Sequence, residues 1–266
     1  MLSELICDAF DPTKMNCALV VKNLKTGESA AWNENRRVPS ASLIKLPIMV
    51  EVMRQARAGR LSLEQRISVA SADKVPFSIL TLLETGNSYS LRDLITLMII
   101  QSDNTAANLL IDRAGSDRIN QGLAELVLPG TVLQRKMMDS AARAAGRENF
   151  TTAADMARLL ELLYRGAVVD AAGSAWMLEI MKNQLNNSMM MQQLPDDTVV
   201  AHKTGDLAGI SHDVGIVYRE DFAYILAVLV WDARTNCDAR LAIGRISRAV
   251  YDYFETKRQP ATTGTL

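Results

Sequence analysis

The sequence of 266 residues has few of the residues that build metal centres and disulfide frameworks. Its two histidines are His202 and His212, and its three cysteines are Cys7, Cys17 and Cys237. An odd number of widely spaced cysteines does not make a disulfide framework. Because no Cys-x-x-Cys pair is present either, we expect no histidine or cysteine metal site and predict no cofactor.

A strong charge and a long apolar run are also missing. The net charge is −1, whereas nucleic-acid-binding domains are strongly basic, so no nucleic-acid partner is expected. No apolar run reaches the roughly 18 residues that a membrane span requires, so no span is predicted. Residues 1–11 include acidic residues and lack the basic start of a signal peptide. The compartment therefore stays open between the cytoplasm and export directed by a leader outside this sequence.

What the sequence does contain is a composition typical of a soluble globular protein, with 48% hydrophobic and 22% charged residues. Val/Ile-rich or otherwise apolar segments of strand length are found near both ends, at 17–22, 29–32, 198–203, 212–218 and 222–231. Helical periodicity is found in the middle and at the end, over 43–58, 91–100, 104–113, 152–164, 175–184 and 239–255. Ser40 and Ser42 are the candidate caps of the first helix, and Pro47 is expected to bend its first two turns.

This order of strands, helices, strands and a final helix predicts an α+β fold in three layers, α/β/α. The first and last strands are expected to meet in one antiparallel sheet flanked by helices. We place residues 1–40 and 190–266 in the lobe with the sheet and residues 41–189 in a mainly helical lobe. No internal repeat or low-complexity linker is present. We therefore expect one unit. The sequence does not determine the oligomeric state, for which a monomer is the expectation.

The first candidate for chemistry is Ser42-Leu43-Ile44-Lys45. Residues three apart on a helix share a face, so the Lys45 amine can reach the Ser42 hydroxyl. A serine is a weak nucleophile until a base takes its proton, and a lysine serves as that base when burial or nearby cations lower its pKa. Ser71-Ala72-Asp73-Lys74 repeats the pattern. Its charged residues interrupt any apolar stripe, and we interpret it as a solvated helix start.

Two further motifs follow along the chain. Ser102-Asp103-Asn104 lies between two predicted helices, where these residue types are also ordinary helix caps. Lys203-Thr204-Gly205 ends an apolar strand. A second Lys-Thr-Gly, at 25–27, falls in the turn of the first predicted hairpin, which explains its glycine.

The three motifs occur in a known order, with Ser102 and Lys203 placed 60 and 161 residues after Ser42. They resemble the motifs of class A β-lactamases and penicillin-binding proteins, and the likeness extends over residues 15–255. Phe77 stands where the family has an aromatic wall for the substrate. The resemblance implies a β-lactamase/transpeptidase-like fold and one catalytic unit with its active site between the two lobes.

The resemblance also implies roles for the first two motifs. Ser42 would attack the substrate carbonyl, and Lys45 would act as the base or orient it. Ser102 would pass a proton to the leaving nitrogen. Asn104 would bind Lys45 and the amide of the substrate side chain.

Substrate binding is implied for the third motif and the residues after it. Lys203 and Thr204 would hold the substrate carboxylate, and Gly205 completes the motif. The backbone N–H of Asp206 would form the oxyanion hole together with that of the nucleophile. His212 falls near the place of a second basic carboxylate anchor in the family. A strand residue packed at a sheet edge is the equally open alternative for this histidine.

The sequence departs from the family pattern in a segment that Arg135 opens and that is similar to the family's Ω-shaped loop. Class A β-lactamases carry a glutamate two residues after this arginine, and it activates the water that hydrolyses the acyl-enzyme. Here the position is Met137, which cannot take a proton from water. Asn149 replaces the usual aspartate, so we expect Arg135 to pair with Glu148 or to hydrogen-bond with Asn149. The other nearby carboxylate is Asp139, which we interpret as a loop cap.

The sequence therefore predicts a serine hydrolase, similar to class A β-lactamases, that opens the amide bond of β-lactams or related small acyl donors and forms an acyl-enzyme. Deacylation is expected to be slow unless Asp139, Glu148 or Lys45 supplies the base. The alternatives are a penicillin-binding peptidase or esterase, and a single-turnover β-lactam sensor.

Two other classes are disfavoured. An inert relative of the family has no need for the intact set of motif residues. A Ser-His-Asp hydrolase would need a Gly-x-Ser-x-Gly turn, and none is present. A periplasmic or secreted location is what the resemblance implies for the compartment.

Overall fold

The structure, a computed structural model, describes residue 2 and residues 13–257. Its main sheet has five antiparallel strands in the order β2-β1-β9-β8-β7. They are β1 (Asn16–Asn23), β2 (Ser29–Trp32), β7 (Val199–Leu207), β8 (Ile210–Tyr218) and β9 (Ala223–Trp231). β1 pairs with β9 along its whole length. The predicted meeting of the first and last parts of the chain in one antiparallel sheet is therefore confirmed.

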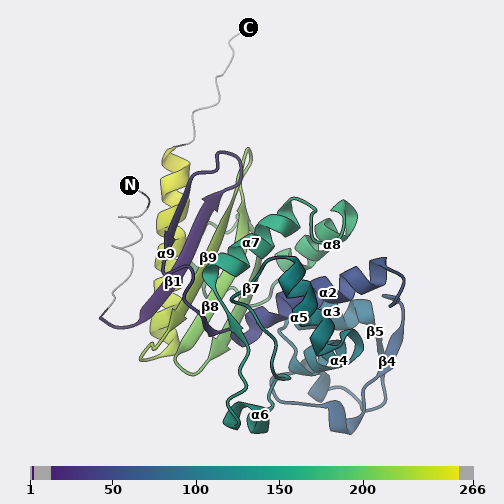
Figure 1. The fold of residues 1–266 in the computed structure, drawn as a ribbon. Coiled ribbons are helices and arrows are strands. Elements are labelled where there is room, and N and C mark those ends of the chain that lie inside the picture. The colour runs from purple at the N-terminus through teal and green to yellow at the C-terminus, as the bar shows by residue number, and fades with distance from the viewer. Residues whose placement is uncertain (1, 3–12, 258–266) are drawn as a thin grey trace.

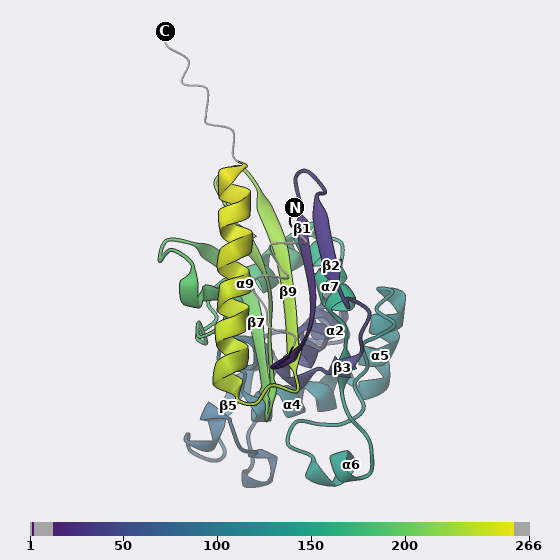
Figure 2. The same cartoon turned by 90° about the vertical axis from the view of Figure 1, so that its left-hand side faces the viewer.

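The central strand β9 shows why both faces of the sheet are covered. All but the last of its residues are buried, and such a continuously apolar strand needs partners on both faces. Alternate residues, beginning with Tyr224 and Leu226, pack in the core on the side of α9 (Asn236–Thr256). The residues between them, such as Ile225 and Ala227, join the larger core under the other helices. Figure 2 shows α9 along one face and α7 (Ala153–Tyr164) behind the sheet, which confirms the three layers.

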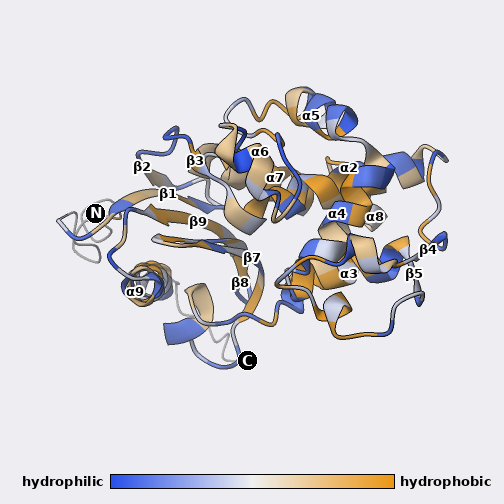
Figure 3. Ribbon diagram, turned by 90° about the horizontal axis from the view of Figure 1, so that it is seen from below, coloured by the Kyte–Doolittle hydropathy of each residue, from blue (hydrophilic) through white to orange (hydrophobic). Residues whose placement is uncertain are grey.

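The other long helices pack together beside the sheet (Figure 1). They are α2 (Lys45–Arg57), α3 (Leu91–Ile100), α4 (Asn104–Ala114), α5 (Ser116–Glu125) and α8 (Ala171–Lys182). In Figure 3 α2 is coloured mainly as hydrophobic, whereas α5 at the rim carries many hydrophilic residues. α7 also comes from the middle of the chain but lies against the sheet. The division of the chain into lobes at residues 40 and 190 stays a prediction.

Short elements complete the chain. η1 (Ala41–Ile44) precedes α2, and β3 (Val38–Pro39) pairs with β6 (Phe150–Thr151). α6 (Ser140–Ala144) lies on the loop before β6. The remaining short elements are β4 (Arg66–Ser68), β5 (Ser88–Ser90), η2 (Ser71–Asp73), η3 (Ile79–Thr81) and η4 (Met190–Gln193). Within residues 2 and 13–257, no helix has the length and apolarity that crossing a bilayer requires.

The start of the first predicted helix differs from the prediction. The α-helix begins at Lys45, after a 3₁₀ turn, and neither Ser40 nor Ser42 caps it with a side chain. Pro47 lies in the first turn of α2, where a backbone N–H would have no partner within the helix in any case. The helix therefore continues through Pro47 to Arg57, and Ser42 is left in the turn with its hydroxyl free for other contacts.

Candidate active site

The Ser42 hydroxyl lies where η1 meets the edge strand β7. Gly205 allows this approach, because a Cβ at this position would lie 3.1 Å from both the Ser42 backbone nitrogen and the Ala41 Cβ. Ala41 itself has a φ of 46°, a left-handed conformation that is unfavourable for a non-glycine residue. The glycine of the Lys-Thr-Gly motif therefore has a steric purpose, which is to let β7 run directly beside the nucleophile.

The fully buried Lys45 side chain joins the first two motifs. Its Nζ lies 3.1 Å from Ser42 Oγ and 2.7 Å from Asn104 Oδ1. It also lies 2.6 Å from the carbonyl oxygen of Ser102 and 3.1 Å from the hydroxyl of that residue. An ammonium group has three protons, so these four oxygen atoms are more than it can serve. A neutral amine likewise has three positions, two N–H groups and a lone pair, and this lone pair can accept the Ser42 proton.

Burial and charge favour that neutral amine. Desolvation lowers the pKa of Lys45 well below its usual value, and the nearby charge of Lys203 lowers it further. The Asp103 carboxylate acts in the other direction but does not reverse the shift. The lowered pKa favours the neutral form of Lys45, which can act as a base.

Ser102 presents its hydroxyl between two buried amines. Its Oγ lies 3.1 Å from Lys45 Nζ and 3.0 Å from Lys203 Nζ. The helix-capping role that the sequence allowed for this motif belongs to Asp103, whose carboxylate accepts the Ala106 N–H at 2.8 Å. Ser102 is free for proton transfer, and its φ of 56° is a strained conformation of the kind found at functional sites.

Lys203 is the second buried amine. It also donates to the Thr204 carbonyl oxygen at 2.8 Å. Burial lowers the pKa of Lys203 to about 7, while the Asp213 and Asp206 carboxylates oppose that shift. The two amines thus flank Ser102 with proton affinities far below those of solvated lysines.

Ser42 and Ser102 open on a cavity of about 750 Å³, whereas the fully buried Lys45 and Lys203 do not line it. Most of the residues predicted from the sequence line it: Ser42, Phe77, Ser102, Asn104, Arg135, Met137, Asp139, Asn149, Thr204, Gly205 and Asp206. Backbone strain gathers at the same place. Of seven described non-glycine residues with left-handed φ angles, four line the cavity: Ala41, Phe77, Ser102 and Met138. Phe77 is 80% exposed, as a residue at the mouth of a substrate cavity can be.

His212 is not at the cavity, and its predicted role as a second carboxylate anchor is wrong. Its ring is buried in β8, which lies between β7 and β9, so the sheet-edge alternative is wrong as well. Nε2 is 2.9 Å from the Pro39 carbonyl oxygen, and Nδ1 accepts the Val230 N–H at 3.2 Å. Burial lowers the pKa of His212, and Nδ1 also lies 2.9 Å from the Ser211 carbonyl oxygen. His212 therefore ties the sheet to β3, which leads into Ser42.

A basic residue that the sequence analysis missed does line the cavity. Arg240, near the start of α9, places its Nη2 3.2 Å from the Asp206 carboxylate. That carboxylate also accepts from Ser211 Oγ at 2.7 Å. Helical periodicity placed this helix correctly, but it carried no sign that its first turns reach the site.

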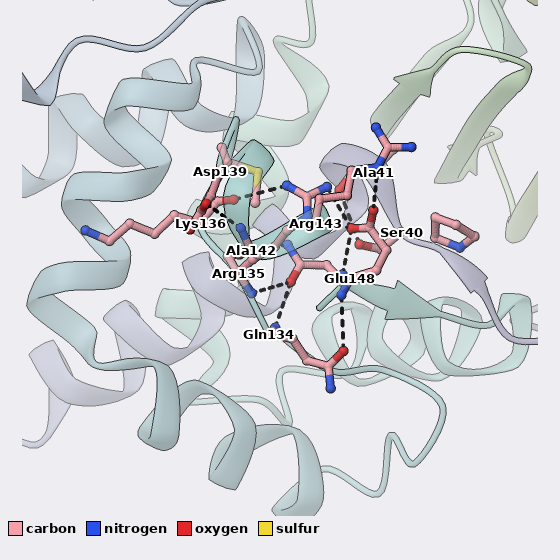
Figure 4. A network of polar contacts seen from close by, with 12 residues as sticks. Ser40, Ala41, Gln134, Arg135, Lys136, Asp139, Ala142, Arg143 and Glu148 are labelled. Carbon is pink, nitrogen blue, oxygen red and sulfur yellow. Dashed lines mark hydrogen bonds and ion pairs between the residues drawn. The ribbon is translucent and has the colours of Figure 1, made fainter. Parts of the chain in front are cut away.

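The loop from Arg135 to Asn149 forms another wall of the cavity, and Figure 4 shows the polar contacts of this loop. Arg135 donates from Nε and Nη2 to Glu148 Oε1, at 2.9 and 2.7 Å. Asn149 Oδ1 accepts the N–H groups of Gln134 and Arg135, at 2.7 and 3.0 Å. Both expected contacts of Arg135 are therefore present. The Ser40 N–H donates to the Asn149 carbonyl oxygen at 2.8 Å, which joins the loop to the nucleophile segment.

Met137 occupies the position where class A β-lactamases carry their glutamate. Its side chain is buried and lines the cavity, and Asn108 holds its backbone with hydrogen bonds of 2.7 and 3.1 Å. Asp139 caps α6 by accepting the Ala142 N–H at 2.8 Å, as predicted. Glu148 is bound by arginines and does not line the cavity. The two nearby carboxylates thus hold the loop together, and a thioether faces the cavity.

The fold and this cluster define a class of protein. A serine beside a buried lysine, a second serine between two buried amines, and an antiparallel sheet flanked by helices are the features of a penicillin-recognising serine hydrolase. Within the described part of the chain, no group of three or more His, Cys, Asp or Glu side chains could hold a metal ion. The sequence model of the β-lactamase enzyme family matches residues 1–254. The chain belongs to this family and is a β-lactamase-like serine hydrolase.

Individual relatives agree with this assignment. A β-lactamase of Rhodobacter capsulatus is 26% identical over 257 residues, which cover 94% of this chain and 87% of the relative. A β-lactamase from Sphaerobacter thermophilus has a crystal structure with 29% identity and a TM-score of 0.89, and the match covers 97% of this chain and 98% of that one. A mutant of PBP-A, solved as an acyl-enzyme complex with penicillin G, has 27% identity and a TM-score of 0.88 over 96% of both chains. The predicted family and fold class are confirmed.

Proposed function

We propose that the chain acylates Ser42 with β-lactams and so breaks the C–N bond of the lactam ring. The observation that carries this proposal is the contact of 3.1 Å between Ser42 Oγ and the amine of Lys45, whose pKa is lowered by burial. Lys45 takes the hydroxyl proton while Oγ bonds to the carbonyl carbon. The backbone N–H groups of Ser42 and Asp206 stabilise the oxyanion that forms.

The leaving nitrogen needs a proton before the C–N bond breaks. Ser102 Oγ donates this proton and regains one from the Lys45 ammonium, which lies 3.1 Å away. The proton taken from Ser42 therefore reaches the product nitrogen, and Lys45 returns to its neutral form.

The remaining groups orient the substrate. Lys203 and Thr204 hold its carboxylate, and Arg240 adds a cation near Asp206. Asn104 is fixed by Lys45 at 2.7 Å and by its own donation to the Pro76 carbonyl oxygen at 3.0 Å. Its second Nδ2 proton is left for the amide of the acyl side chain.

Hydrolysis of the acyl-enzyme is proposed to be slow. A water molecule at Met137 meets a thioether, which is not a general base, while Asp139 and Glu148 are engaged in the loop. Met137 also favours a second candidate function, a penicillin-binding peptidase or esterase that releases the acyl group slowly. The similarity to PBP-A, whose mutant was solved as an acyl-enzyme with penicillin G, supports this candidate.

The experiment is to mix the protein with excess benzylpenicillin and to follow its intact mass. We expect one penicillin mass added per chain, an adduct that decays slowly, and no adduct on Ser42→Ala. Ser71→Ala is the matched control, because it removes the serine of the other Ser-x-x-Lys motif, and it should acylate like the wild type. No adduct and no consumption of penicillin would contradict acylation at Ser42. Rapid consumption of penicillin would contradict slow hydrolysis.

A further inference from the structure

A buried pair lies behind Lys203, apart from the chemistry described so far. His202 on β7 and Asp213 on β8 are 1% and 0% exposed, and neither lines the cavity. His202 Nδ1 is 2.9 Å from Asp213 Oδ1. Gly215 stands opposite His202 in the sheet, and a Cβ at Gly215 would lie 2.5 Å from the His202 Cβ. The strand β8 therefore has a glycine where the histidine needs space.

The other polar atoms of the pair hold a wall of the cavity. Asp213 Oδ2 accepts the Met190 N–H at 3.0 Å, and His202 Nε2 is 3.3 Å from Asn187 Oδ1. The preceding residue, Asn186, lines the cavity, and its Nδ2 is 3.4 Å from Thr204 Oγ1. Residues 186–190 are thereby held against the Thr204 hydroxyl, which is proposed to bind the substrate carboxylate.

The Asp213 carboxylate also acts on Lys203 through its charge. Among the described residues, the hydrogen bonds of Lys203 Nζ go to neutral oxygen atoms. Burial disfavours the ammonium form, and Asp213 opposes this more strongly than Asp206 does. The Asp206 charge is further offset by Arg240, 3.2 Å away. His202 Nδ1, 2.9 Å from Asp213 Oδ1, fixes the orientation of that carboxylate.

We propose that His202 and Asp213 are positioning residues for the substrate carboxylate, because they keep Lys203 charged and hold Asn186 against Thr204. This inference rests on the proposed acylation at Ser42. It predicts that substitution of either residue slows acylation by substrates with a charged carboxylate. The chemical step at Ser42 itself should be unaffected.

The test compares benzylpenicillin with its methyl ester, which has the same ring and side chain but no carboxylate charge. The acylation rate constant of each compound is measured by intact mass for the wild type, Asp213→Asn and His202→Ala. With benzylpenicillin at a pH above 7 we expect a loss of up to about tenfold in Asp213→Asn, the effect of roughly one pKa unit of interaction on Lys203. With the ester we expect a loss of less than about twofold. His202→Ala should also lower the ratio of the rate constant for benzylpenicillin to that for the ester.

Asp155→Asn is the matched control. Asp155 is a buried aspartate on α7 that accepts from Thr131 Oγ1 at 2.6 Å and does not line the cavity, so its loss should leave the ratio of the two rate constants unchanged. This ratio does not depend on the fraction of folded protein, which separates positioning from general damage.

Three outcomes decide the inference. A selective loss with benzylpenicillin supports it. Parallel losses with both compounds, or no loss with either, overturn the role of the pair, while acylation of the wild type by benzylpenicillin leaves the proposed function standing. No adduct on the wild type with either compound overturns the proposed function and this inference with it.

Discussion

Two walls of the cavity differ in what their polar groups are free to do. Around Ser42 and Ser102, hydroxyls and buried amines lie within 3.1 Å of one another and can exchange protons. Along the loop from Arg135 to Asn149, the polar groups are bound to each other, and Met137 stands where the family has a base. The comparison underlies the proposal that making and breaking the acyl-enzyme depend on separate regions, so that the chain keeps the first step without the second.

The largest effect is expected from a substitution in the first wall. Lys45→Met keeps an unbranched side chain of similar volume but removes the amine that takes the Ser42 proton. We expect acylation by benzylpenicillin to slow by about 10²–10⁴-fold, the usual contribution of a general base. Lys74→Met, in the exposed second Ser-x-x-Lys motif, is the control and should acylate at the wild-type rate. Acylation of the Lys45 variant at a near-normal rate would place the base elsewhere.

The next largest effect is expected from a substitution that supplies a carboxylate in the second wall. Met137→Glu places a carboxylate on a backbone that Asn108 already holds at 2.7 and 3.1 Å. We expect hydrolysis of the acyl-enzyme to accelerate by at least about tenfold, because a carboxylate can take a proton from water, while acylation stays within about threefold of the wild type. Met138→Glu adds the same charge on the neighbouring, more exposed side chain and should not accelerate hydrolysis. Equal adduct lifetimes in Met137→Glu and the wild type would show that the missing carboxylate does not limit turnover.

The pH dependence of acylation tests the electrostatics of the first wall. Lys203 must be charged to hold the substrate carboxylate, and burial lowers its pKa to about 7. The second-order rate constant, which reports the free enzyme, should therefore fall as the pH rises through that value. Asp213 raises the pKa of Lys203, so Asp213→Asn should move this falling limb to lower pH.

The other titratable groups near Lys203 are Lys45, Asp206 and His202, which contacts Asp213. Acylation by the methyl ester of benzylpenicillin should lack the falling limb near pH 7, because the ester has no carboxylate for Lys203 to hold. If the falling limb moved to higher pH in Asp213→Asn, it would contradict the statement that Asp213 raises the pKa of Lys203.

The smallest effect on chemistry is expected from the second wall. Glu148→Gln removes the charge that Arg135 contacts twice, in a pair whose side chains are 9% and 14% exposed. We expect the free energy of unfolding to fall by about 1–3 kcal/mol in urea titrations, with acylation changed by less than about threefold. Glu64→Gln, at a side chain that is 76% exposed, should change neither quantity. If Glu148→Gln slowed acylation as much as Lys45→Met, the two walls would not be separate.

In the first wall only the contact between Ser42 and Lys45, three residues apart, is local. The contacts of Ser102 with Lys45 and Lys203 join residues 57 and 101 positions apart, and they could be predicted only from the resemblance to the family. In the second wall, the cap at Asp139 follows from the residue type at a loop-to-helix junction. His212 was misplaced because spacing along β8 does not say which side chains of a strand reach a neighbouring cavity. Arg240 was missed because the contact between α9 and the cavity depends on how the helix packs across the sheet. Such placement is set by long-range packing and has no signature in nearby residues.

The central claim is that this cavity forms an acyl-enzyme readily and hydrolyses it slowly. The most direct measurement is the rapid-mixing time course of a chromogenic cephalosporin with the wild-type chain, with the intact mass recorded in parallel. The account predicts a burst of colour equal to one equivalent of protein, a slow steady phase, and a mass adduct that persists through it. Fast linear turnover without a burst or an adduct would contradict it.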